Sequence, residues 1–269
     1  MTTWRFAPGP VLVAGPCVVE EGDLLPRVAT RLAEIGARLT LPVCFKASFD
    51  KANRSRLGGP RGPGLQDGLS LLAAARQASG LPVLTDVHEA AQAGTVAEVA
   101  DALQVPAFLC RQTDLLVACG RTGKPVNVKK GQWMDPEGMR GSLEKVRSGG
   151  AAEIAVTERG TFFGYGDLVV DFRGLARLRA ATGAPVLFDA THSVQRPGQG
   201  ALGASGGERS HIPALLAAAA AAGADGFFLE THPDPARAPS DPETQWPLDE
   251  LEPLLRRTLR IWRAAREAA

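Results

Sequence analysis

The chain has 269 residues, of which 45% are hydrophobic and 22% charged, which is ordinary for a soluble globular enzyme. Thirty basic side chains against twenty-nine acidic ones leave a net charge of +1, which excludes a general attraction to nucleic acid or membranes, so any anion site must be local. The four cysteines form no Cys-x-x-Cys pair, and neither a signal peptide nor a long apolar run is present, so we expect a protein of the reducing cytoplasm.

Apolar runs of strand length recur, and each is followed by a longer segment with helical periodicity. They predict strands at residues 11–15, 41–47, 82–86, 102–106, 125–129, 153–157, 185–190 and 225–230. Eight βα units in one chain predict a (β/α)8 TIM barrel, one domain spanning residues 1–269. A doubly wound sheet is the alternative, but no Gly-x-Gly-x-x-Gly follows the first strand and no break in composition marks a second domain.

Polar side chains follow every predicted strand, at the end of the barrel where TIM barrels place their chemistry. In chain order these residues are Cys17, Lys46 with Ser48, Asp86 with His88, Gln104, Lys129, Arg159, Asp189 with His192, and Glu230 with His232. Any one of them could be an ordinary loop residue. Eight sets that converge on one rim predict a functional site there.

The segment KASFDKANRSRLGGPRGPG, residues 46–64, carries five cations against one Asp, together with glycines that let backbone approach a ligand. It predicts a cradle for phosphate or carboxylate groups, because Arg binds oxyanions through two parallel hydrogen bonds and Lys acts as a point charge. A solvated basic loop is the alternative. Lys129 and Arg159, after the fifth and sixth strands, indicate a second anionic group.

Lys and Asn are rare in this chain, with six Lys and two Asn beside twenty-four Arg. Genomic G+C pressure or heat adaptation could each cause this bias. The remaining Lys and Asn are expected where their chemistry resists replacement by Arg or another residue. Asn53, Asn127, Lys129 and Lys130 are among them and lie in two short segments.

Cys17, His192 and Glu230 follow the first, seventh and eighth strands, which become neighbours when the barrel closes, and Asp241 follows in a Pro-containing loop. Cys, His, Glu and Asp together suit a divalent ion such as zinc, iron or manganese. Spacing alone leaves this open, because four scattered ligand types occur in most chains and His211 and His232 are equally visible. Cys44, Cys110 and Cys119 are interpreted as small core residues.

Several segments closely resemble the 3-deoxy-D-manno-octulosonate 8-phosphate synthase family. They run in order from about residue 11 to residue 250: GPC, FKASFDKANRS, RGPGL, TDVHE, PAFLCRQTDLL, VNVKKGQW, TERGTFFGYGDLVVD, FDATHSVQ and FLETHPDP. The resemblance implies a TIM barrel, usually a homotetramer, that condenses phosphoenolpyruvate with D-arabinose 5-phosphate and water. The products would be the eight-carbon acid phosphate and inorganic phosphate, a step toward the inner-core sugar of Gram-negative lipopolysaccharide.

The resemblance also implies roles for individual residues. Phosphoenolpyruvate would be bound by Lys46, Ser48 and Lys51 at its carboxylate and by Gln104, the Ala107 backbone, Lys129 and Arg159 at its phosphate. Arabinose 5-phosphate would be bound by Asn53, Arg54 and Ser55 at its phosphate, with Arg111 from a neighbouring subunit, and by Asp86 and Gln195 at its hydroxyl or carbonyl groups.

The family has metal-dependent and metal-independent branches, with Cys in the N-terminal motif of the first and Asn in that of the second. GPC at 15–17 and SDPETQ at 240–245 resemble the metal-dependent branch. This implies one divalent metal ion per subunit, held by Cys17, His192, Glu230 and Asp241. The ion could polarise the aldehyde or activate the attacking water.

Two other functions remain as alternatives. A sister enzyme makes 3-deoxy-D-arabino-heptulosonate 7-phosphate from erythrose 4-phosphate, but its sugar-phosphate loop reads Lys-Pro-Arg-Thr-Ser where this chain has KANRS. A non-catalytic sugar-phosphate sensor would be expected to have lost part of the metal set or Lys129 and Arg159. The chain departs from the family pattern at residues 56–60, and the Gly-rich segment 197–208 is expected to move until substrate binds.

Overall fold

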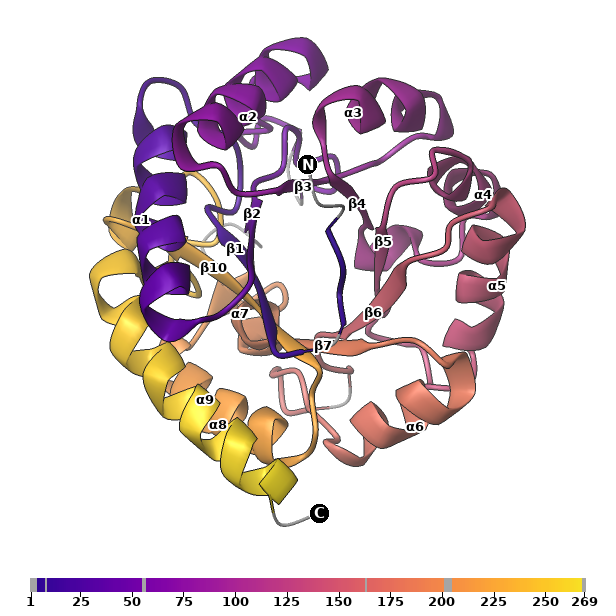
Figure 1. Ribbon diagram of the computed structural model, residues 1–269, viewed down its shortest axis with the longest axis vertical. Coiled ribbons are helices and arrows are strands. Elements are labelled where there is room, and N and C mark those ends of the chain that lie inside the picture. Colours follow the sequence, from indigo (N-terminus) through magenta and orange to yellow (C-terminus); the bar gives the residue numbers. More distant parts are fainter. Residues whose placement is uncertain (1–3, 8, 55–56, 163, 201–204, 268–269) are drawn as a thin grey trace.

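A closed ring of eight parallel strands forms the centre of the protein, as the computed structural model of residues 4–7, 9–54, 57–162, 164–200 and 205–267 shows (Figure 1). The strands are β1 (Val11–Gly15), β2 (Val43–Lys46), β3 (Val83–Asp86), β4 (Ala102–Val105), β5 (Val126–Lys129), β6 (Ile154–Glu158), β7 (Val186–Asp189) and β10 (Gly226–His232). Each pairs with the next, and β10 pairs with β1, so no edge is left open. The predicted TIM barrel is confirmed.

Helices surround this ring on its outer side (Figure 1). They are α1 (Leu24–Leu39), α2 (Leu65–Ser79), α3 (Ala93–Val99), α4 (Thr113–Arg121), α5 (Met139–Gly149), α6 (Arg173–Thr182), α8 (Ile212–Ala221) and α9 (Leu251–Glu267). The short helix α7 (Ala190–Ser193) follows β7 directly and lies within the outline of the ring in Figure 1. The apolar stripes of α1 and α9 face the strands, as the buried Leu32 and Leu255 illustrate. Among the described residues, none of the helices has the length and apolar character needed to cross a membrane.

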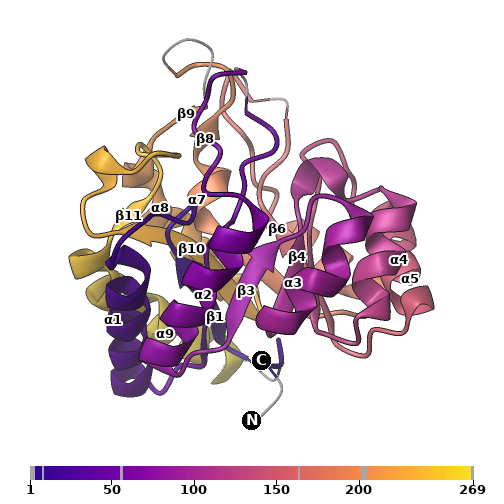
Figure 2. The same cartoon turned by 90° about the horizontal axis from the view of Figure 1, so that it is seen from above.

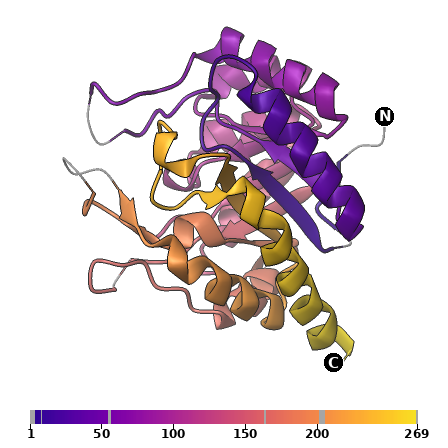
Figure 3. The same ribbon diagram turned by 90° about the vertical axis from the view of Figure 1, so that its left-hand side faces the viewer.

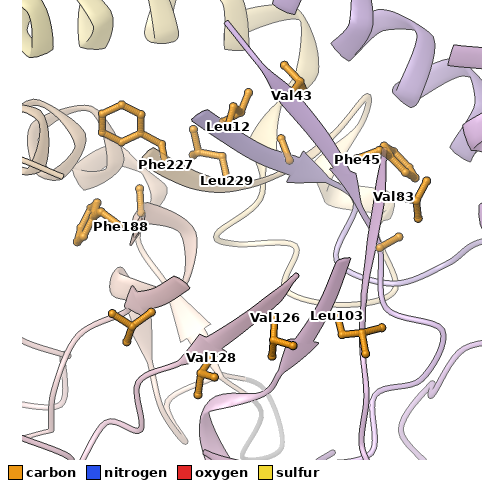
Figure 4. Packing of buried hydrophobic residues seen from close by; sticks show 14 of the residues in the cluster. Leu12, Val43, Phe45, Val83, Leu103, Val126, Val128, Phe188, Phe227 and Leu229 are labelled. Carbon is orange, nitrogen blue, oxygen red and sulfur yellow. The ribbon is translucent and has the colours of Figure 1, made fainter. Parts of the chain in front are cut away.

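Strand side chains alternate between two environments, because successive residues of a strand point to opposite faces. Outward-facing residues such as Leu12, Phe45 and Val126 are buried against the helices and form the main core, and Figure 4 labels ten of them around the ring. The strands are therefore covered on both faces, which explains why they read as continuous apolar runs in the sequence. Their predicted bounds agree with the structure to within two residues.

The end of the barrel near the chain termini is closed by apolar side chains. The segment before β1, which contains Trp4 and Phe6, crosses this end (Figure 1). The rings of Trp4 and Phe6 meet edge to face with centroids 6.1 Å apart. Together with inward-facing strand residues they form a second buried cluster, consisting of Trp4, Phe6, Val11, Val13, Cys44, Leu84, Ala102, Ala155, Leu187 and Phe228. We call this cluster the floor of the barrel.

Long loops project from the opposite end, away from both termini (Figures 2 and 3). They include the segment after β2 and the segment after β7, which contains the short antiparallel pair β8 (Gln195–Arg196) and β9 (Gly206–Gly207). The loop after β10 adds β11 (Trp246–Pro247). Ser55 and Arg56, and residues 201–204 of the Gly-rich segment, lie outside the described residues.

Candidate active site

A cavity of about 430 Å³ opens at the loop end of the barrel. Most of the predicted site residues line it, namely Lys46, Ser48, Lys51, Asn53, Arg54, Asp86, Gln104, Ala107, Lys129, Arg159, His192, Gln195 and Asp241. Cys17 and Glu230 are fully buried beside it. Closure of the barrel therefore brings together side chains that are spread over more than two hundred residues of the sequence.

Lys46, at the end of β2, is a buried residue of the cavity wall. Its Nζ donates to Glu230 Oε1 at 2.8 Å and lies 3.7 Å from Asp86 Oδ2. Burial alone would lower the pKa of Lys46, but the Glu230 and Asp86 carboxylates outweigh it and raise the pKa above its ordinary value. Lys46 is therefore a permanent cation, and it is partly neutralised before any ligand arrives.

Lys129 and Arg159 form a second cationic pair, at the ends of β5 and β6. The Lys129 ammonium donates to Asp189 and lies 3.3 Å from the centroid of the Phe228 ring. Burial lowers the pKa of Lys129 to about 8 in spite of the Asp189 carboxylate. The guanidinium of Arg159 donates to Gln195, while its NH1 is buried with no protein partner among the described residues. These two cations can therefore bind an incoming anion.

Gly15 explains why GPC can bring a cysteine to this site. A Cβ at residue 15 would lie 2.1 Å from the Lys46 carbonyl oxygen, so only glycine lets β1 approach β2 this closely. The chain then continues to Cys17, whose Sγ lies 3.1 Å from Asp241 Oδ2. Asp241 has φ of 50°, in the left-handed region that Asp tolerates better than most residues.

The four predicted metal ligands lie close together, and three of them form a compact group. One ligand atom each from Cys17, Glu230 and Asp241 lies within 4.8 Å of the other two. His192 adjoins this set, with Nε2 3.7 Å from Glu230 Oε2 and Nδ1 2.6 Å from Asp189 Oδ2. The Asp189 contact leaves Nε2 turned toward Glu230, as in many metal sites where a carboxylate orients the histidine ligand.

The chemistry of these side chains fits a divalent cation. Glu230 Oε2 is fully buried, and no protein group within the described chain hydrogen-bonds to it. Burial, followed by the Glu230 and Asp241 carboxylates, raises the pKa of the Cys17 thiol well above its ordinary value. A cation between these groups would offset the repulsion and displace the thiol proton.

The residues predicted to hold the sugar phosphate are less uniformly placed. Arg54 folds back over the cavity edge, where Nε donates to the Pro60 carbonyl at 2.6 Å and NH1 to Ser240 Oγ at 2.9 Å. Asn53 is exposed beside it. Arg111 is exposed and does not line the cavity of its own chain.

Asp86 and Gln195 lie deeper in the cavity than Arg54. Asp86 accepts hydrogen bonds from Ser48 and from Gln104 Nε2, the second at 2.7 Å. Gln195 Nε2 donates to Asp241 Oδ1 at 2.6 Å, so this amide connects the predicted metal set with Arg159.

A buried ion pair behind the site was missed by sequence reasoning. Lys130 is 1% exposed, and its Nζ lies 3.5 Å from Glu158 Oε1 and 3.3 Å from the Gly131 and Met134 carbonyl oxygens. Glu158 Oε1 also accepts from the backbone N–H groups of Arg159 and Gly160 at 3.0 and 2.7 Å. The pair holds the backbone next to Lys129 and Arg159. The only sequence signal was the survival of a second Lys in a chain that prefers Arg.

Comparison with known proteins agrees with this geometry. Residues 8–261 match the model of the DAHP synthetase I family. The chain belongs to this family. A 2-dehydro-3-deoxyphosphooctonate aldolase of Nitratidesulfovibrio vulgaris (strain DP4) is 52% identical over 258 residues, which cover 96% of this chain and 94% of the relative.

Other proteins with the same name are equally similar. The aldolase of Nitrobacter winogradskyi is 54% identical over 248 residues, covering 92% of this chain and 86% of the relative. That of Granulibacter bethesdensis is 53% identical over 248 residues, covering 92% and 87%. The resemblance to the octulosonate 8-phosphate synthases is thus confirmed. DAHP synthetase, from which the family takes its description, is the sister enzyme that makes 3-deoxy-D-arabino-heptulosonate 7-phosphate.

Proposed function

We propose that the protein condenses phosphoenolpyruvate with D-arabinose 5-phosphate and water to give 3-deoxy-D-manno-octulosonate 8-phosphate and inorganic phosphate. The observation that carries this proposal is the cavity at the barrel mouth, which is lined by the buried cations Lys46, Lys129 and Arg159 and by the partly exposed cations Lys51 and Arg54. Two substrates that each carry a phosphate require cations at two places. The names of the similar family members support the same reaction. The proposal includes that the protein acts in the cytoplasm and that its product is used for the synthesis of lipopolysaccharide.

The reaction forms one carbon–carbon bond and, with water, one carbon–oxygen bond, and it breaks the carbon–oxygen bond to the phosphate. The enol carbon of phosphoenolpyruvate attacks the aldehyde carbon, whose oxygen takes a proton and becomes a hydroxyl. Water adds to the adjacent carbon, and inorganic phosphate leaves with the electron pair of the broken bond. Negative charge gathers on the departing phosphate, so Lys129 and Arg159 would stabilise it there, because cations placed where charge develops lower the barrier.

The remaining residues would orient the two substrates. Lys46 and Lys51 would bind the carboxylate of phosphoenolpyruvate, with Ser48 beside them, and the Ala107 backbone would complete its phosphate site. Asp86 can accept a hydrogen bond from a sugar hydroxyl in addition to those it already receives. Phe108 and Phe162 line the outer wall of the cavity and would exclude water once substrates are bound.

Product analysis tests the reaction most simply. The protein is incubated with phosphoenolpyruvate and either arabinose 5-phosphate or erythrose 4-phosphate, and the products are separated and identified. We expect the eight-carbon product to form faster by a wide margin. Faster formation of the seven-carbon product would show that the protein catalyses the sister reaction. If neither product formed, the proposed reaction would be wrong.

We further propose that Cys17, His192, Glu230 and Asp241 hold one divalent ion, and their donor atoms suit zinc, iron and manganese. When bound, it would supply Lewis-acid activation of the aldehyde or of water. Cys17→Asn is expected to lose tightly bound metal yet keep activity in excess chelator, whereas Cys17→Ala keeps far less, since Asn can donate a hydrogen bond into the vacated space. Elemental analysis is run in parallel, and full metal content in either variant would remove Cys17 from the ligand set.

A homotetramer is the third part of the proposal. Exposed apolar side chains gather on the loops after β4, β5 and β6, where Phe108 and Trp133 stack with centroids 6.0 Å apart and Tyr165 is fully exposed. Such side chains are suited to an interface between copies. Arg111 lies three residues after Phe108 and would reach a neighbour's sugar phosphate.

Subunit mixing tests the role of Arg111. Inactive Arg111→Ala and Lys46→Met subunits are unfolded, mixed and refolded, with light scattering to count subunits. Recovered activity is expected, since each mixed interface would contain one intact site. A monomer, or no recovery from a confirmed mixed oligomer, would contradict this part.

A further inference from the structure

Four buried polar side chains form a continuous hydrogen-bonded row across the inside of the barrel. Asp86 on β3, Gln104 on β4, Asn127 on β5 and Thr157 on β6 are between 0% and 6% exposed. Thr157 Oγ1 lies 2.8 Å from Asn127 Oδ1, Asn127 Nδ2 lies 2.8 Å from Gln104 Oε1, and Gln104 Nε2 lies 2.7 Å from Asp86 Oδ1. Neighbouring strands thus each contribute one member, and Asn127 and Thr157 have no role in the reaction described so far.

The chemistry of Asp86 fixes the direction of every bond in this row. Burial alone would raise the pKa of Asp86, but the Lys46 and Lys51 ammonium groups outweigh it and hold the pKa well below its ordinary value. An ionised carboxylate only accepts hydrogen bonds. Gln104 must therefore turn its NH2 group toward Asp86 and its carbonyl oxygen toward Asn127.

The directions of the remaining hydrogen bonds, as far as Thr157, follow in the same way. Because Gln104 offers its carbonyl oxygen, Asn127 must offer its NH2 group, and its own oxygen then faces Thr157. The Thr157 hydroxyl can donate to that oxygen. Every bond consequently runs from Thr157 toward Asp86, without any freedom for either amide to turn over.

The direction of these hydrogen bonds determines whether the Gln104 amide presents an N–H donor or a carbonyl oxygen to the cavity. An amide NH2 group has two N–H donors, and Asp86 takes one of them. Gln104 lines the cavity with Lys129 and Arg159, so its second N–H is available to an anion there. In the turned-over amide a carbonyl oxygen would repel the same anion.

We propose that Asn127 and Thr157 are positioning residues that hold the Gln104 amide with an N–H donor facing the phosphate of the bound substrate. The proposal rests on the proposed function, which assigns that phosphate to phosphoenolpyruvate. It also accounts for Asn127, one of two Asn in the chain. Asp at this place would offer no donor to Gln104 unless protonated, and Leu would offer none.

A matched pair of threonines separates positioning from simple loss of a buried hydrogen bond. Thr157 and Thr85 are both 0% exposed, and each donates one hydrogen bond, Thr157 to Asn127 at 2.8 Å and Thr85 to the Ala47 carbonyl at 2.7 Å. Thr157→Val and Thr85→Val are expected to melt at similarly reduced temperatures. Only Thr157→Val should raise the Kd of phosphoenolpyruvate, by about threefold or more, measured by calorimetric titration. Equal Kd values for the two variants would overturn the proposal.

Asn127→Asp supplies a readout that a purely structural role would not move. The ratio of its phosphoenolpyruvate Kd to that of the wild type is measured from pH 6 to pH 9, so that titration of the ligand and of shared groups cancels. The ratio should rise at least tenfold as the introduced carboxyl loses the proton that it must donate to Gln104. A ratio that does not change with pH would overturn the proposal. If the wild type itself failed to bind phosphoenolpyruvate, the proposed function would be at fault instead.

Discussion

The two halves of the barrel interior are built from the same strands but have opposite chemistry. The floor holds Cys44, Leu84, Ala102, Ala155, Leu187 and Phe228. Two residues further along, the same six strands place Lys46, Asp86, Gln104, Thr157, Asp189 and Glu230 on the same inward face. A shift of two residues along each of these strands therefore separates an apolar layer from a layer in which every side chain is polar or charged.

This contrast shows how the barrel divides stability from chemistry. Charges in the upper layer are buried, and each is held by an opposite charge or a hydrogen bond, as Lys46 is held by Glu230 and Asp86. The apolar floor beneath them keeps water away, which strengthens every charge interaction above it. The floor should therefore govern folding stability, and the upper layer should govern binding and turnover.

Phe6→Ala tests the floor and should have the largest effect. Phe6 is 0% exposed and packs against Trp4, so its removal leaves a cavity that costs about 3–5 kcal/mol in the free energy of unfolding. The KM for phosphoenolpyruvate should stay within about twofold of the wild type well below the melting temperature. Denaturant unfolding and steady-state kinetics check the two halves of this prediction. A large change in KM with little loss of stability would show that the layers are not separate.

Lys46→Met tests the upper layer with a side chain of similar length. Glu230 and Asp86 would lose their shared cation, and kcat/KM should fall by about 10²–10³-fold. Lys124→Met serves as the control, because Lys124 precedes β5 at the other end of the barrel and is not part of the cavity wall. Similar kinetics for both variants would contradict the role given to Lys46.

Arg159→Ala and Arg54→Ala test the division of the upper layer into two anion sites. Loss of a charge-assisted contact costs about 1.5–3 kcal/mol, or roughly ten- to a hundredfold in affinity. Arg159→Ala should weaken phosphoenolpyruvate binding more, and Arg54→Ala should weaken arabinose 5-phosphate binding more. Calorimetric titration of both ligands into both variants gives the four values required. Equal losses of affinity in all four titrations would show that the upper layer contains one anion site and not two.

The pH dependence of phosphoenolpyruvate binding tests Lys129 and should be the smallest effect. With a pKa of about 8, Lys129 is protonated at pH 7 and increasingly neutral above pH 8, so a bound phosphate must first restore its charge. The Kd should rise about tenfold between pH 7 and pH 9, a range in which the ligand phosphate stays doubly ionised. Lys129→Arg should remove this dependence, because Arg keeps its charge. An unchanged Kd in the wild type would show that Asp189 keeps Lys129 protonated.

The sequence predicted the barrel well because its determinants are local. Buried strands give continuous apolar runs, and each run ends where a polar residue follows, so β1 to β7 and β10 and the ends that carry Lys46, Asp86 and Lys129 could be read directly. Cys17 and Asp241 are 224 residues apart, and only ring closure shows that their side chains meet. Spacing could not have settled that contact, and the family resemblance supplied it.

Other features depend on packing that leaves no periodic signal. The segment with Trp4 and Phe6 is too short to show a pattern, although it closes the floor. Lys130 and Glu158 look like surface charges in a sequence, and only the structure shows them buried against each other. The row from Thr157 to Asp86 likewise needs four strands in register before its members meet.

A crystal structure of the protein with both substrates bound, in a slowly reacting variant, would show directly whether the barrel mouth holds two separate anion sites. We expect the phosphate of phosphoenolpyruvate against Lys129 and Arg159, the sugar phosphate beside Arg54, and both carbon chains between them in the upper layer of the barrel. The anomalous signal of phosphorus locates the two phosphates independently of the carbon density. Either phosphate found outside this layer, or both bound at one cluster of cations, would contradict the account.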